Sequence, residues 1–320
     1  MNLRCPKCGR VGLYETNPGT YGCPWLDCKL KGYVPKKEIY NGDAITLEEK
    51  ELHKKIMKDL EKITMPELSC IVAYAKSPDP QRDEATTKLI NCFLAQRFRK
   101  FELIVVEFAK DGIGKFPYGW IVDKHIILQD DRPFNKSWLM NVGARVATTN
   151  NLIFHDADVL FGKDYLEKIN EFRKTHVLFS GWSSFRCMPG RDNPHMRIHV
   201  PRTISCLIGA WFCNKDYYWN TFGGYNEDYF GYGREDSDIW HRATYLLDGI
   251  PVMDYPLVHY YHNWHPDSGP NPLIREDKRA NAILEKCMKN PEEIRQMLLK
   301  VKLGNMEHPT LIHDENYETE

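Results

Sequence analysis

The sequence lacks several features that would assign the protein to a class at once. No apolar run approaches the ~20 residues that a membrane-spanning helix needs. The first residues, MNLRC, carry no apolar core of a signal peptide. We therefore expect a soluble, cytoplasmic protein without a transmembrane segment. No Gly-x-Gly-x-x-Gly or Walker-type loop follows any predicted strand, which disfavours a dinucleotide oxidoreductase or a P-loop NTPase.

An excess of charge of either sign is also missing. The chain carries 43 Lys and Arg against 44 Asp and Glu, a net charge of -1. It therefore has no overall positive field with which to hold nucleic acid. The 320 residues, 42% of them hydrophobic, are enough for a large core, and we expect one main domain with an appendage.

Four of the ten cysteines stand in two short clusters near the N-terminus. Cys5 and Cys8 form the first pair, and Cys23 and Cys28 form the second, separated by a polar, hairpin-like segment. Four thiolates at such spacings can close a tetrahedral Zn²⁺ site, with a disulfide pair or a redox dithiol as the alternative. The CPKCG cluster and the second pair resemble the zinc-ribbon family. That resemblance implies a structural Zn²⁺ that serves folding and docking.

The segment after the cysteines has the pattern of an amphipathic helix. Residues 44–65 place apolar side chains at helical spacing among alternating Glu and Lys. Thr46 and Glu49 form a capping box at its start, and Pro66 ends it. We therefore predict a zinc ribbon over residues 1–40 and a helical linker over residues 41–66.

Strand and helix patterns alternate in the rest of the chain. We predict strands over residues 69–74, 102–108 and 125–128, helices over residues 84–100 and 135–148, and another strand from residue 151. This order predicts an α/β fold with a mostly parallel central sheet and flanking helices. Residues 191–202 have few apolar side chains and are predicted to form a flexible loop. Closing helices and an acidic tail are predicted after residue 269.

The strand that begins at residue 151, NLIFHDADVLF, ends in two acidic residues, Asp156 and Asp158. In an extended backbone these two side chains would point to the same side. Ligands of open α/β sheets gather at the carboxyl ends of strands, and two carboxylates there suit Mg²⁺ or Mn²⁺. A solvated pair of turn aspartates explains the same motif equally well, so this motif alone does not decide.

Three ordered motifs resemble a known group of enzymes. Residues 134–143, FNKSWLMNVG, followed by FHDAD, look like the GT-A fold of nucleotide-sugar glycosyltransferases. Residues 222–238, FGGYNEDYFGYGREDSD, resemble the C-terminal motif of the β-1,4-galactosyltransferase family and of related polypeptide N-acetylgalactosaminyltransferases and chondroitin polymerases. Residues 258–262, VHYYH, fall where those families place a metal-binding histidine. The resemblance implies a GT-A domain over residues 67–268.

The resemblance also implies roles for individual residues. Asp158 and Asp156 would bind Mn²⁺ or Mg²⁺ with either His259 or His262, and Asp156 is the less certain ligand because it can contact the nucleotide ribose instead. Asp236 would be the general base of an inverting displacement. The remaining predicted residues are Glu235 for acceptor hydroxyls; Glu107, Asn141 and Lys136 for the donor nucleotide; and Phe230, Tyr232, Gly233 and Arg234 for the acceptor sugar.

The predicted function is a metal-dependent transfer of a sugar from a nucleoside diphosphate sugar, with UDP as the expected nucleotide, to a hydroxyl-bearing acceptor. Two alternatives remain open. One is a glycosyltransferase that modifies nucleic acid and is targeted by the zinc ribbon, although the near-neutral charge disfavours it. The other is a zinc-ribbon interaction protein whose transferase domain is catalytically inactive. The acceptor class, the donor sugar and the oligomeric state have no signal in the sequence.

Overall fold

The computed structural model describes residues 65–77, 80–180, 209–231, 233–247 and 278–312, and the strands at 14–17, 20–22, 34–35, 184–187, 197–199 and 259–262. The chain divides into two compact units. The first comprises Met1–Met65 and Pro117–Lys124, and the second comprises Pro66–Phe116 and His125–Glu320. We describe each unit by itself.

The first unit contains a three-stranded antiparallel sheet in the order β1-β2-β3. Its strands are β1 (Tyr14–Asn17), β2 (Thr20–Gly22) and β3 (Val34–Pro35). The pairing of β1 with β2 confirms the hairpin expected between the cysteine clusters. The four cysteines Cys5, Cys8, Cys23 and Cys28, and the helix predicted over residues 44–65, lie outside the described residues.

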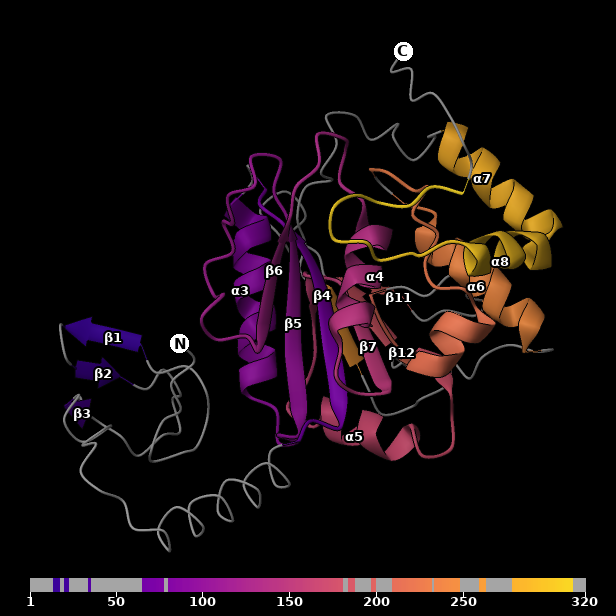
Figure 1. The fold of residues 1–320 in the computed structure, drawn as a ribbon. Helices are drawn as coiled ribbons and strands as arrows, with labels where there is room; N and C mark the ends of the chain where they lie inside the picture. Colours follow the sequence, from indigo (N-terminus) through magenta and orange to yellow (C-terminus); the bar gives the residue numbers. More distant parts are fainter. Residues whose placement is uncertain are drawn as a thin grey trace, which may run out of the picture. The chain divides into compact units, whose positions relative to one another are not determined.

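The second unit is built on a six-stranded sheet in the order β6-β5-β4-β7-β12-β9 (Figure 1). The strands are β4 (Leu68–Ala75), β5 (Phe101–Phe108), β6 (Lys124–Leu128), β7 (Asn151–His155), β9 (Leu178–Ser180) and β12 (Ala210–Asn214). The parallel pairing predicted for the central strands holds for β5, β4 and β7. However, β12 runs antiparallel to both β7 and β9, so the sheet is mixed.

Helices cover both faces of this sheet, as the near-continuous apolar strands require. On one face, α4 (Lys136–Val146) packs its buried residues, among them Leu139 and Val142, against Ile71 of β4 and Ile104 of β5. On the other face, Phe93 of α3 (Pro80–Leu94) contacts the ring of His155 with centroids 5.4 Å apart. Helix α3 ends six residues earlier than the predicted 84–100, while the other predicted central elements lie within one or two residues of their expected positions.

A second, four-stranded sheet has the order β11-β10-β13-β8. Its strands are β8 (Val159–Leu160), β10 (Ser184–Cys187), β11 (Arg197–His199) and β13 (His259–His262). The prediction of a loop over residues 191–202 was therefore wrong for Arg197–His199, which pair with β10. Strand β8 follows directly on the acidic motif, so this sheet brings β13 beside that motif.

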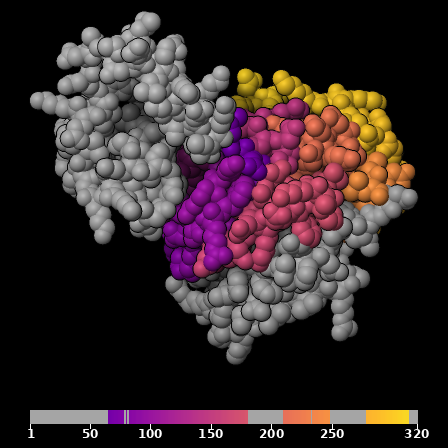
Figure 2. Space-filling view, turned by 90° about the horizontal axis from the view of Figure 1, so that it is seen from below, coloured from indigo at the N-terminus to yellow at the C-terminus, as the bar shows by residue number. Residues whose placement is uncertain are grey.

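The second unit contains four more helical elements of interest: the short α5 (Tyr165–Phe172) after β8, α6 (Glu235–Leu246), α7 (Lys278–Lys289) and α8 (Pro291–Lys300). Helices α7 and α8 confirm the closing helices that we predicted after residue 269. Figure 2 shows α3 and the α5 region next to one another on one face, with the layer of α6 to α8 at the edge. No helix in the described ranges has the length and apolar character needed to span a bilayer.

Helix α4 lies unusually close to the sheet at Gly143. A Cβ atom placed on this residue would overlap Cγ2 of Ile71 on β4. We predict that Gly143→Ala lowers the free energy of unfolding by about 1–2 kcal/mol, because the overlap outweighs the better helix propensity of alanine. Thermal unfolding measures this effect. Gly162→Ala is the control, since its Cβ would meet only the movable Asp164 carboxylate at 3.1 Å, and equal stability of the two variants would contradict the prediction.

Candidate active site

Three carboxylates from two distant parts of the chain converge on one ammonium group. Lys136 Nζ lies 2.8 Å from Asp156 Oδ1, 3.1 Å from Glu235 Oε1 and 2.9 Å from Asp236 Oδ2. Lys136, Asp156 and Asp236 line a small hollow together with Tyr225 and other residues. The structure thus brings together four of the residues that the sequence singled out.

The ends of secondary-structure elements hold these side chains in place. Asp156 directly follows β7, and its N–H donates to Gly209 O at 2.7 Å. Glu235 and Asp236 open α6, where the helix dipole stabilises negative charge. Lys136 opens α4, where the same dipole disfavours a positive charge. A lysine at this position is explained by its carboxylate partners and not by the helix.

The site carries an excess of negative charge, because three carboxylates face a single ammonium group. Burial alone would lower the pKa of Lys136, but Asp156, Asp236 and Glu235 outweigh it and raise that pKa well above its usual value. Burial raises the pKa of Asp236 to about 8, with Lys136 opposing and Glu235 and Asp156 adding to the rise. Burial likewise raises the pKa of Asp156, against Lys136 and in concert with Asp158. A further cation beside Asp156 would relieve this repulsion.

The acidic motif at the end of β7 is a turn and not a continued strand. Strand β7 ends at His155, and Ala157 and Asp158 form a turn that leads into β8. The expectation that Asp156 and Asp158 share one side of an extended backbone was therefore wrong. The charge of Asp158 nevertheless acts on Asp156 and raises its pKa, as expected for two neighbouring carboxylates.

The described side chains around this turn include two carboxylates, Asp156 and Asp158, but no complete set of metal ligands. No three His, Cys, Asp or Glu side chains in the described ranges lie close enough to hold a metal ion. The missing ligand can come from β13, whose backbone pairs antiparallel with β8. In this register His262 lies opposite Val159, next to Asp158 in sequence, whereas His259 lies at the far end of β13. The register therefore favours His262 over His259.

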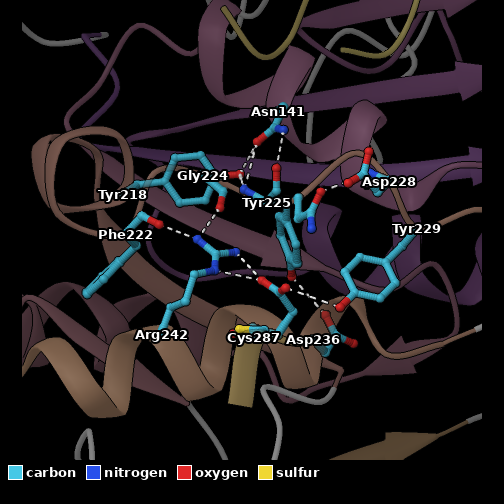
Figure 3. A network of polar contacts seen from close by, with 12 residues as sticks. Asn141, Tyr218, Phe222, Gly224, Tyr225, Asp228, Tyr229, Asp236, Arg242 and Cys287 are labelled. Atoms are coloured by element: carbon cyan, nitrogen blue, oxygen red, sulfur yellow. Dashed lines mark hydrogen bonds and ion pairs between the residues drawn. The ribbon is translucent and has the colours of Figure 1, made fainter. Parts of the chain in front are cut away.

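A buried polar network lies next to Asp236 (Figure 3). Arg242 of α6 donates through Nε to Asp238 Oδ1 at 2.7 Å and through Nη1 to the carbonyls of Phe222 and Gly224. Tyr225 OH donates to Asp236 Oδ1 at 2.8 Å. The sequence assigned no role to Arg242, Asp238 or Tyr225. Their positions in the acidic, glycine-rich motif were visible, but only the fold shows which carboxylate each one contacts.

Two residues predicted to contact the donor nucleotide are completely buried. Asn141 donates to Tyr225 O and Glu227 Oε1, and it accepts from Tyr218 OH and from Tyr225 N–H, which uses all its hydrogen-bonding positions. Glu107 accepts the N–H groups of Lys115 and Phe116 and lies 2.8 Å from His125 Nε2. Both side chains thus hold loops, and their contact with a donor nucleotide stays a prediction.

The residues predicted to bind an acceptor sugar differ in burial and in their contacts. Phe230 is buried beneath the guanidinium of Arg132, 5.0 Å from the ring centroid, so its face is not open for stacking. Gly233 and Arg234 both have positive φ, 87° and 78°, just before α6. Such a conformation is uncommon and costly for a non-glycine residue. Arg234 Nε donates to Asn281 of α7 at 2.8 Å, and Tyr232 lies outside the described residues.

No family model matches the sequence, and no curated protein matches it either. Solved structures of S. aureus TarS are similar at low sequence identity. Residues 1–349 of TarS align at 15% identity and a TM-score of 0.47, covering 73% of this chain and 69% of that chain. The same fragment in complex with UDP-GlcNAc aligns at 16% identity and a TM-score of 0.49, and the alignment covers 73% of this chain and 70% of that chain. A structure of TarS without this restriction aligns at 16% identity and a TM-score of 0.45, and the alignment covers 73% of this chain and 42% of that chain.

Proposed function

We propose that the protein is a glycosyltransferase that moves a sugar from a nucleoside diphosphate sugar to a hydroxyl group. One observation carries this proposal. The acidic turn after β7 and the Glu235-Asp236 pair of α6, far apart in sequence, meet at a single lysine. In this proposal the turn would bind the diphosphate and Asp236 would be the general base, the two functions that sugar transfer to a hydroxyl requires.

The arrangement of elements supports a GT-A-like fold for this domain. The parallel strands β5, β4 and β7 have helices on both faces, and the acidic turn lies at the carboxyl end of β7. In open α/β sheets that edge is the usual place for a nucleotide ligand. The motif FGGYNEDYFGYGREDSD, which resembles the β-1,4-galactosyltransferase group, contributes Tyr225 and Asp236 to the lining of the hollow.

Asp158, Asp156 and His262 are the residues that would hold a divalent cation in this proposal. Asp158 and Glu235 add negative charge around Asp156, and the backbone pairing of His262 with Val159 is the reason for choosing His262 over His259. Imidazole among carboxylates favours Mn²⁺ over Mg²⁺. The bound cation would stabilise the negative charge of the departing diphosphate. Lys136, 2.8 Å from Asp156, would add a second positive charge on the donor side.

Asp236 would take the proton from the acceptor hydroxyl as that oxygen attacks the sugar carbon, with inversion at that carbon. Its side chain is 17% exposed, so an acceptor can reach it from solvent. Glu235, on the same ammonium group, would accept hydrogen bonds from other acceptor hydroxyls. The acceptor itself remains open. Cys5, Cys8, Cys23 and Cys28 would hold a structural Zn²⁺.

Thermal unfolding with a panel of nucleotide sugars tests the proposal, beginning with UDP-linked donors. Mn²⁺ and the matching donor together should raise the Tm, because a ligand that binds only the folded state stabilises it by about 2.7 kcal/mol at 100 times its Kd. For a chain of this size that is a rise of several degrees. Asp158→Ala should abolish the part of the rise that depends on Mn²⁺.

Asp164→Ala is the matched control, since Asp164 lies shortly after β8 but pairs with Lys168 on the surface. It should keep the full rise in Tm. The proposal would be abandoned if the folded protein showed no rise with any donor, with or without Mn²⁺.

A further inference from the structure

The proposed base, Asp236, is held from two sides. Its Oδ2 lies 2.9 Å from Lys136 Nζ of α4, and its Oδ1 accepts from Tyr225 OH at 2.8 Å. Each carboxylate oxygen thus has its own donor, and the two donors come from different elements. Two such contacts fix the rotation of the carboxylate, so it presents itself to an acceptor in a single orientation.

Tyr225 lies in the same motif as Asp236, eleven residues earlier, but the motif does not reveal that the two side chains are in contact. Its side chain is completely buried. Asn141 clamps its backbone from both sides, accepting the N–H at 3.1 Å and donating to the carbonyl at 2.8 Å. The ring packs edge-on against Phe154 and Trp211, with centroids 5.8 and 5.7 Å apart. The hydroxyl therefore has a fixed position (Figure 3).

The direction of the hydrogen bonds at this hydroxyl follows from the groups involved. Trp211 Nε1 lies 2.9 Å from Tyr225 OH, and an indole nitrogen can only donate. The hydroxyl oxygen must therefore accept from Trp211, and its single proton is left for Asp236. A donor directed at a carboxylate favours the ionised form, which is the form that a general base requires.

We propose that Tyr225 and Trp211 are positioning residues that orient Asp236 as the base. This inference rests on the proposed function, in which Asp236 takes the proton of the acceptor. The hydroxyl of Tyr225 donates to Asp236, which this proposal assigns to the acceptor and not to the donor. Its effect should therefore fall on the rate of transfer and not on donor binding.

The test compares the kcat and the donor KM of variants in turnover of the nucleotide sugar that stabilises the protein. Tyr225→Phe keeps the ring and removes the donor, so kcat should fall about tenfold or more while the donor KM and the donor-induced rise in Tm stay unchanged. Trp211→Phe should lower kcat in the same way by a few-fold. Adding Tyr225→Phe to Asp236→Asn should cause no further loss, because both act through one carboxylate.

Tyr229→Phe is the matched control. It also removes a hydroxyl that donates to a carboxylate of α6, but that carboxylate is the structural Asp238, 3.1 Å away. This variant should keep kcat within about twofold. The inference is overturned if Tyr225→Phe keeps full kcat, raises the donor KM instead, or loses no more activity than Tyr229→Phe. A wild-type protein with no turnover of any nucleotide sugar would overturn the proposed function first, and this inference with it.

Discussion

Replacing Asp236 by asparagine should lower turnover of the nucleotide sugar by roughly 10²- to 10⁴-fold, the usual contribution of a positioned general base. Asparagine has the same shape, and its amide oxygen can accept from one of the two donors, Lys136 or Tyr225, that now contact the carboxylate. It cannot take a proton from an acceptor. The fold and the donor-induced rise in Tm should therefore remain, and only the chemical step should be lost. Initial rates of nucleoside diphosphate release measure this effect.

Glu235→Gln is the control, because it alters the neighbouring carboxylate on the same ammonium group, 3.1 Å from Lys136 Nζ. With water as the acceptor, this variant should lose much less activity than Asp236→Asn, since Glu235 is assigned to the sugar acceptor and not to the proton. Equal losses in both variants, or a fully active Asp236→Asn, would show that Asp236 is not the base.

The second large effect concerns stability, at the buried pair of Arg242 and Asp238. Both side chains are completely buried, and Arg242 also holds the carbonyls of Phe222 and Gly224. Arg242→Met would leave the charge of Asp238 without its cation, which typically costs 3–5 kcal/mol. We expect a fall in Tm on the order of 10 °C in thermal unfolding. Activity should fall as well, because the released carbonyls precede Tyr225 in the chain.

The double variant Asp238→Leu with Arg242→Met separates lost charge pairing from lost packing. Replacing both partners of a buried pair by apolar residues is often tolerated, so the double variant should recover part of the lost Tm. An Arg242→Met protein as stable as the wild type would contradict the role of this pair. A double variant less stable than Arg242→Met would show that Asp238 stabilises the fold through another contact, such as the one with the hydroxyl of Tyr229.

The central strands could be predicted because their signal is local. Residues 69–74 and 102–108 are short apolar runs between polar segments, and β4 and β5 lie there. The direction of β12 could not be predicted in this way. An apolar run such as Ala210–Asn214 fits a buried strand of either direction, and only pairing with β7 sets it antiparallel.

The candidate site was predictable where charge itself was the signal. Asp156, Glu235, Asp236 and Lys136 are polar residues at the ends of predicted elements, and the structure brings them together. The role of Asn141 was harder to predict, because a polar residue inside a motif can either bind a ligand or form hydrogen bonds with the protein's own backbone. Here Asn141 donates to the backbone carbonyl of Tyr225. A phenol aimed at a carboxylate has no sequence signature, which is why Tyr225 was missed.

Release of nucleoside diphosphate from a nucleotide sugar in the presence of Mn²⁺ tests the central claim most directly. We expect the wild-type protein to release it slowly, with water replacing the natural acceptor, and Asp158→Ala and Asp236→Asn to be much slower while they remain folded. A folded wild-type protein that neither binds nor hydrolyses any donor of the panel would contradict the claim that this site transfers sugars.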